Sequence, residues 1–93
     1  MTSLVDHIAI LVDDLKVAEK WYLEHLSGEV THRDEKYVRI QIKNTNIALI
    51  DKKYYPNAHF GILVEKVEEL PLELGEAVYH RDGTIGVYVK DPF

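Results

Sequence analysis

The feature that most constrains this chain is an internal repeat. The segment Asp6–Val12 (DHIAILV) matches Ala58–Val64 (AHFGILV), and Val30–Asp34 (VTHRD) matches Val78–Asp82 (VYHRD). The first pair of blocks is offset by 52 residues and the second by 48, so the offsets differ by about one helical turn. Two matching blocks in the same order indicate two related supersecondary units, the second with a shorter helix.

The first unit, residues 1–51, predicts the order strand, helix, strand, strand, strand. The apolar run Leu4–Val12 is typical of a strand buried on both faces. Asp13 or Asp14 can cap the helix that follows, and Gly28 is placed to end it. The apolar stripe of that helix consists of Leu15, Ala18, Trp21, Tyr22, His25 and Leu26. Strands are expected at Glu29–Arg33, Tyr37–Lys43 and Ile47–Asp51, with a tight turn at Asn44–Asn46.

The second unit, residues 58–93, follows a polar linker at 52–57 and stops one strand short. A strand is expected at His59–Val64, and a short helix over Val67–Leu74 that contains Pro71. Two strands are expected at Val78–Arg81 and Ile85–Lys90, with Asp82-Gly83 as the turn between them. The missing strand leaves an unpaired sheet edge, which natural proteins cover or pair, so we expect a homodimer.

Charge and composition exclude several classes of protein. The net charge of −5 argues against nucleic-acid binding, which needs clustered Lys and Arg. The absence of cysteine excludes a disulfide scaffold, a thiol nucleophile and thiolate metal ligands. The first residues do not have the pattern of a signal peptide, and no apolar run has the length of a membrane span. We therefore expect a cytoplasmic protein with no membrane segment.

Three motifs in this order resemble those of one superfamily. The first is Val5–Leu15, which runs into a helix with Trp21-Tyr22, the second is Ala58–Ile62, and the third is Val87–Pro92. Together they make the whole chain similar to the vicinal oxygen chelate superfamily, the group of glyoxalases, bleomycin-resistance proteins and extradiol dioxygenases. The resemblance implies an α+β fold in which two tandem βαβββ modules form a curved mixed sheet around a cavity, with the helices outside.

The resemblance also implies a metal site. His7 and His59 fall on the positions whose histidines bind a divalent ion in metal-dependent members. Neutral imidazoles suit Zn, Ni, Mn, Fe or Co. The carboxylate ligand of the first module falls at or near Ala48, which cannot ligate, and the second carboxylate would lie beyond the end of this chain. The alternative for each histidine is a hydrogen-bonded structural role without metal.

Four further side chains are candidates for the cavity wall. Tyr37, Arg39 and Gln41 share the polar face of one predicted strand, and Tyr88 lies on the corresponding later strand. If that face lines the cavity, Gln41 can reach a metal and Arg39 an anionic molecule. The alternative is that this face is solvated. His32 and His80 each precede Arg-Asp, where a turn role with the Asp capping local amides is favoured.

Three functions remain open at this point. The first is a metal-dependent protein of the glyoxalase type that binds a small oxygenated molecule; as an enzyme it would be a lyase, isomerase, transferase or dioxygenase. The second is a metal-free dimer of the bleomycin-resistance type that sequesters a small molecule. The third is a degenerate, non-catalytic relative. Retention of His7 and His59 favours the first, and the absence of the carboxylates favours the other two.

Overall fold

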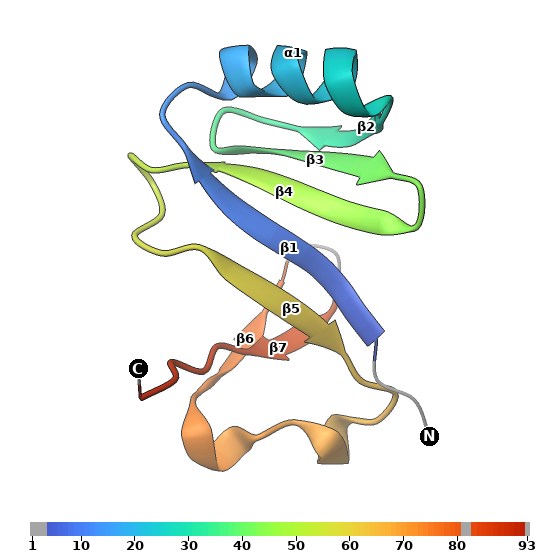
Figure 1. Ribbon diagram of the computed structural model, residues 1–93. Helices are drawn as coiled ribbons and strands as arrows, with labels where there is room; N and C mark the ends of the chain where they lie inside the picture. The colour runs from blue at the N-terminus through green and yellow to red at the C-terminus, as the bar shows by residue number, and fades with distance from the viewer. Residues whose placement is uncertain (1–3, 81–82, 93) are drawn as a thin grey trace. The chain divides into compact units, whose positions relative to one another are not determined.

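The computed structural model describes residues 4–80 and 83–92 (Figure 1). The chain divides into two compact units, one formed by Leu4–Leu63 and the other beginning at Val64. The division therefore falls after the strand that we expected to open the second module.

The first unit opens with a strand and a helix at the predicted places. β1 spans Leu4–Val12 and α1 spans Leu15–Leu26. The Asp14 carboxylate caps α1 by accepting hydrogen bonds from the backbone N–H groups of Lys16 (3.0 Å) and Val17 (3.2 Å). The helix ends because Ser27, not Gly28, adopts the left-handed conformation, with φ 54°.

Three strands complete the predicted order. β2 spans Glu29–Arg33, β3 Tyr37–Ile42 and β4 Thr45–Asp51. The turn between β3 and β4 lies at Lys43-Asn44, one residue before the predicted position, and Lys43 has φ 56°. A two-residue hairpin turn requires positive φ, and this brings Thr45 and Asn46 into β4.

The strands form one mixed sheet, which confirms the α+β class. The order is β2-β3-β4-β1-β5, where β5 spans His59–Leu63. β1 runs parallel to β4 and antiparallel to β5, and the remaining pairs are antiparallel. The central position of β1 brings residues near the start of the chain beside β5, which follows more than 50 residues later.

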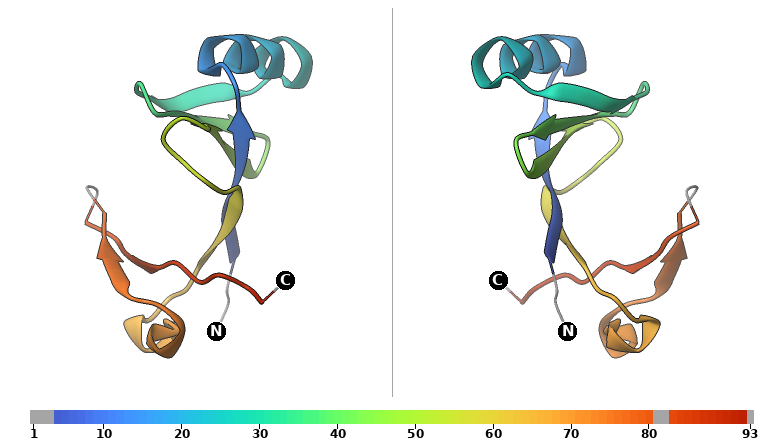
Figure 2. Two further views of the ribbon diagram at one scale, coloured as in Figure 1. Left: turned by 90° about the vertical axis from the view of Figure 1, so that its left-hand side faces the viewer. Right: turned by 90° about the vertical axis from the view of Figure 1, so that its right-hand side faces the viewer.

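The two faces of this sheet are covered differently. α1 lies over one face (Figure 2). On that face Leu15, Ala18, Tyr22 and Leu23 pack against the buried side chains of Val38, Ile40 and Leu49. The opposite face, which we refer to as the open face, holds a second cluster. It consists of Ala9, Ala48 and Ile50, with Leu11, Tyr37 and Tyr55 packed against it. The linker thus packs onto the sheet through Tyr55.

Two expectations about burial in this unit are wrong. Trp21, His25 and Leu26 are exposed on α1 rather than part of its buried stripe, and the rings of Trp21 and His25 stack on each other. β1 is not buried on both faces: of its residues only Ala9 is buried, and Leu4 and Val5 are more than 60% exposed. The reason is that α1 packs on β3 and β4 and leaves the start of β1 uncovered.

The second unit contains less regular structure than predicted. Two short 3-10 helices, Val67–Glu69 and Leu72–Leu74, replace the helix expected over Val67–Leu74. Pro71 between them lacks the N–H and disfavours helical geometry in the residue before it, so one continuous helix does not form. β6 spans Ala77–Tyr79 and pairs antiparallel with β7 at Ile85–Val87. Arg81 and Asp82, which we placed in a strand end and a turn, lie outside the described residues.

Candidate functional site

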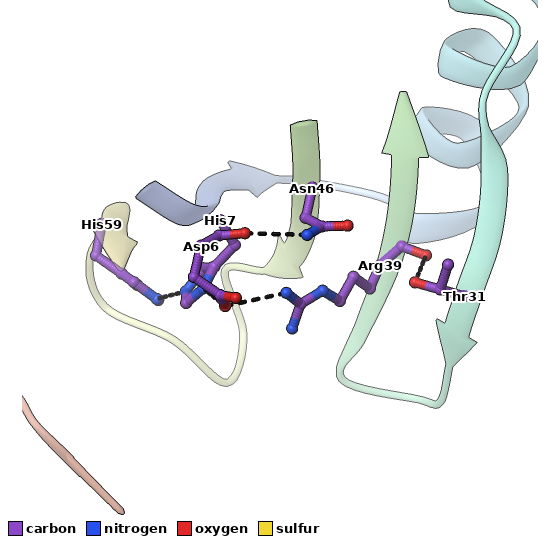
Figure 3. A network of polar contacts seen from close by, with 6 residues as sticks. All are labelled: Asp6, His7, Thr31, Arg39, Asn46 and His59. Atoms are coloured by element: carbon purple, nitrogen blue, oxygen red, sulfur yellow. Dashed lines mark hydrogen bonds and ion pairs between the residues drawn. The ribbon is translucent and has the colours of Figure 1, made fainter. Parts of the chain in front are cut away.

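The two repeated histidines meet on the open face of the sheet. His7 comes from β1 and His59 from β5, and the two strands are adjacent and antiparallel. Their Nε2 atoms are 3.1 Å apart, and the rings lie edge to face with their planes at 89° (Figure 3). The structure therefore brings together side chains that are 52 positions apart in sequence.

Asp6 extends this pair into a network. Its Oδ2 atom lies 2.9 Å from Nδ1 of His7 and 3.0 Å from Nη2 of Arg39 (Figure 3). Strand alternation would point Asp6 and His7 to opposite faces, but the β1–β5 register shifts between Val5 and His7. Such a bulge re-aims a side chain, and here Asp6 reaches the same network as His7. Sequence reasoning missed Asp6 because the bulge has no signature in the pattern of residue types.

The charge of Asp6 is stabilised by its partners. Partial burial raises the pKa of its carboxyl, but the hydrogen bonds from His7 and Arg39 and their charges outweigh burial, so the pKa lies below its ordinary value of 3.8. Asp6 is thus an anion at neutral pH and accepts a hydrogen bond from Nδ1 of His7. In the neutral tautomer of His7 that donates from Nδ1, the lone pair is at Nε2, the atom 3.1 Å from Nε2 of His59.

The pKa of His59 is also shifted, in the direction that favours the neutral ring. Burial lowers its pKa below 6.5, and the neighbouring charge of His7 lowers it further. A hydrogen bond to the backbone of Asn57 acts in the opposite direction and favours an N–H on the ring. If His7 gives its N–H to Asp6 and His59 gives its N–H to Asn57, both Nε2 atoms present lone pairs to each other. Two facing lone pairs repel, and a separation of 3.1 Å leaves room for a shared proton on the line between them, whereas a metal ion would have to lie to one side of that line.

The separation of the two nitrogens fits coordination of one metal ion. Metal–imidazole bonds of about 2.0–2.1 Å and the observed 3.1 Å between nitrogens correspond to an N–metal–N angle of about 95–102°. That angle suits two neighbouring positions around an ion. The carboxylate of Asp6 on the far nitrogen of His7 is the group that commonly orients a metal-binding histidine.

The protein supplies few further ligands. Among residues 4–80 and 83–92, no group of three or more His, Cys, Asp or Glu side chains could hold a metal ion. Ala48 lies opposite Ala9 rather than beside His7, and the in-step β1–β4 register puts Asn46 opposite His7. Asn46 donates from Nδ2 to the backbone oxygen of Asp6 (3.1 Å), and its side-chain oxygen points away from His59 (Figure 3). His7 and His59 therefore fit two positions of an ion, and other positions are open to water or a bound molecule.

Three of the four predicted cavity residues lie on the open face of β3, opposite residues 50, 48 and 46 of β4, and these are Tyr37, Arg39 and Gln41. Arg39 joins the histidine network through Asp6. Tyr37 instead stacks on His32, with ring centroids 4.7 Å apart, and Gln41 is exposed. Tyr88 belongs to the second unit, where its ring contacts His80.

An open groove of about 600 Å³ lies elsewhere in the first unit. It is lined by the start of α1, by the end of β2 and the turn after it (33–35), and by Asp51 at the end of β4 together with Lys53. None of the predicted site residues lines it. The cavity over the histidine pair therefore stays a prediction.

The first repeated His-Arg-Asp block has the predicted turn role. Asp34 accepts hydrogen bonds from the backbone N–H groups of Lys36 (2.8 Å) and Tyr37 (3.0 Å). Its other oxygen lies 2.8 Å from Nε2 of His32. The hydrogen bond from His32, helped by the two backbone N–H groups, lowers the pKa of Asp34 to about 2. These contacts close the β2–β3 turn and assign the block no site role.

Comparison with known proteins adds no assignment. No protein-family model matches the sequence, and no curated protein matches it. In the described part of the chain, no helix has the length and apolar character needed to cross a membrane. The case for function therefore depends on the geometry around His7 and His59.

Proposed function

We propose that this chain is a glyoxalase/bleomycin-resistance-like protein that binds a small oxygenated molecule on the open face of its sheet, with a divalent metal held by His7 and His59. The observation that carries the proposal is the 3.1 Å approach of the two Nε2 atoms. One histidine stands at the same position of each sequence repeat, and a shared ligand role accounts for both. Zn, Ni, Mn, Fe and Co all suit such nitrogens.

Each residue of the network has a distinct part in this proposal. His7 and His59 bind the ion through Nε2, while Asp6 holds the ring of His7 in the required orientation. When bound, such an ion polarises an oxygen of the bound molecule or acidifies a bound water. Arg39 uses Nη2 to contact Asp6, and its remaining N–H groups suit an anionic oxygen of that molecule. If the protein is an enzyme, these parts serve a metal-dependent lyase, isomerase, transferase or dioxygenase.

The finer architecture is part of the proposal. We infer two tandem modules that enclose a cavity, a homodimer and a cytoplasmic location. The order β1-α1-β2-β3-β4 supports the first module. The position of His59 on β5, beside β1, supports the pairing of the opening strands of the two modules. Tyr37, Gln41 and Tyr88 remain candidates for the wall of that cavity.

A second candidate function is a metal-free dimer of the bleomycin-resistance type that sequesters a small molecule. One observation favours it: a proton shared between the two Nε2 atoms accounts for a separation of 3.1 Å as well as an ion does. In that case the histidine pair is a structural link between β1 and β5. A degenerate relative without a ligand would have the same link.

Metal analysis separates these functions. Protein purified without a His tag or chelator is expected to contain close to one divalent ion per chain and to lose it in His7→Ala. His25→Ala is the matched control, because His25 is an exposed helix residue that contacts only Trp21 in the described structure. Absence of metal, together with unchanged melting temperature on addition of Zn²⁺, Ni²⁺ or Mn²⁺, would exclude the metal-dependent function. A thermal-shift screen of small molecules on the same sample then tests sequestration.

A further inference from the structure

Gly61 lies directly against the ring of His7. The two residues are opposite each other in the β1–β5 ladder, so their side-chain positions share one face of the sheet. A Cβ atom at position 61 would lie 2.8 Å from Nδ1 and 3.1 Å from Nε2 of His7, and closer still to Cε1. Contacts this short between a Cβ atom and ring atoms are repulsive, so any larger residue at 61 displaces the imidazole.

Space, not backbone conformation, explains the glycine. The positive-φ residues of the described chain are Ser27, Lys43 and Gly83, and Gly61 is not among them. An alanine can therefore adopt the backbone of residue 61 without strain, and in a strand it is ordinarily the more favourable residue. The unfavourable contact comes from His7 alone, since all three nearest atoms to the added Cβ belong to that ring.

The ring of His7 cannot move aside without loss. Its Nδ1 is bound to Asp6 (2.9 Å) and its Nε2 to His59 (3.1 Å), so a displacement breaks at least one of these contacts. Asp6 is itself held by Arg39 and by Asn46. A flexible side chain would accommodate the methyl group easily, but an imidazole fixed at both nitrogens does not.

From these contacts we infer that Gly61 is a positioning residue for the histidine pair: the absence of a side chain lets the ring of His7 lie against β5 at position 61, so that its Nε2 reaches Nε2 of His59. The effect of Gly61 on metal binding rests on the proposed function. Its effect on the contact between His7 and His59 does not. This role accounts for a glycine inside a strand, where glycine ordinarily lowers the stability of the sheet.

The test is Gly61→Ala, alone and combined with His7→Ala, with metal-free protein measured first. In wild-type protein, NMR is expected to show a nuclear Overhauser contact between the ring protons of His7 and His59, which Gly61→Ala abolishes. Gly61→Ala should also lower the melting temperature by roughly 5 °C, the change produced by loss of about one hydrogen bond in a domain of this size. In the His7→Ala background the same substitution should leave the melting temperature unchanged or raise it.

Metal binding is the second readout. If the wild type binds Zn²⁺, Gly61→Ala should weaken binding by about 10- to 100-fold, the range found when groups that orient a ligand are removed. If the wild type binds none, the proposed function fails, while the ring contact and melting temperatures still test Gly61. An intact ring contact in Gly61→Ala, or an equal loss of stability with and without His7, would overturn the inference. Failure of Gly61→Ala to fold supports it only if the double variant folds.

Discussion

Replacement of Asp6 by asparagine removes the charge that links the histidine pair to Arg39. The substitution keeps the shape of the side chain but leaves one oxygen to accept hydrogen bonds and adds an NH₂ group that cannot accept any. In the structure a single oxygen of Asp6 contacts both Nδ1 of His7 and Nη2 of Arg39. The amide oxygen of Asn can take the place of this oxygen, but it carries no negative charge, so Asp6→Asn weakens both contacts.

The size of the effect follows from these contacts and their exposure. A hydrogen bond to a charged group contributes about 1.5–3 kcal/mol when it is shielded from water. The side chains of Asp6 and Arg39 are 35% and 32% exposed, so solvent screens the pair and the lower part of that range applies. We expect Asp6→Asn to reduce the free energy of unfolding by about 1.5 kcal/mol, which lowers the melting temperature by roughly 5–10 °C.

Urea unfolding at neutral pH, followed by Trp fluorescence, measures this difference. Trp21 is the only tryptophan of the chain and lies in the same unit as Asp6. Asp13→Asn is the matched control: Asp13 pairs with Lys52, but the two side chains are 82% and 62% exposed. Solvent screens such an exposed pair, so its loss should leave the stability nearly unchanged.

The effect also has a defined pH dependence. Since the pKa of Asp6 in the folded protein is below its ordinary value of 3.8, its contribution is fully present above that value. The contribution is lost as the pH falls through the lowered pKa, so the wild type and Asp6→Asn should converge in acid. Equal stability of the two proteins at pH 7, or an equal loss in Asp13→Asn, would refute the network as described.

Three further predictions concern the framework around the site. Asp34, whose pKa is about 2, should stabilise the fold above about pH 3.8 and lose this contribution as the pH falls from 3.8 to 2. The urea midpoints of Asp34→Asn and wild type should therefore differ at pH 6 and converge near pH 2. Ser27→Gly should raise the free energy of unfolding by about 0.5 kcal/mol in urea titration, because Ser27 has φ 54°, which glycine adopts without strain. Leu49→Ala should lower it by about 3 kcal/mol in the same assay, because Leu49 is fully buried; a loss below about 1 kcal/mol would contradict the assigned core.

Residue periodicity was sufficient to predict most of the first unit. Alternation over Tyr37–Ile42 and the apolar run Leu4–Val12 each predicted a strand that the structure contains. The helical stripe predicted α1 correctly but not its orientation, since Trp21 lies on the solvent side. Periodicity fixes the kind of element, whereas which flank of a helix is buried depends on the strands beneath it.

Only part of the candidate site could be predicted from the sequence, and the reason is physical. His7 and His59 were identified by the repeat, which compares positions along the chain and does not depend on local geometry. The roles of Asp6 and Gly61 depend on a bulge and on a strand register, and neither follows from residue types. The helix expected over Val67–Leu74 failed because the effect of Pro71 was underestimated.

The central claim is that two histidines from the two repeats bind one ion. Calorimetric titration of Zn²⁺ into metal-free wild type, His7→Ala, His59→Ala and His25→Ala tests it most directly. We predict one ion per chain for wild type and His25→Ala, and affinity at least about 100-fold weaker in each of the other two variants, because each loses one of two protein ligands. Wild-type protein that does not bind Zn²⁺, or equal affinity in His7→Ala or His59→Ala, would contradict the claim.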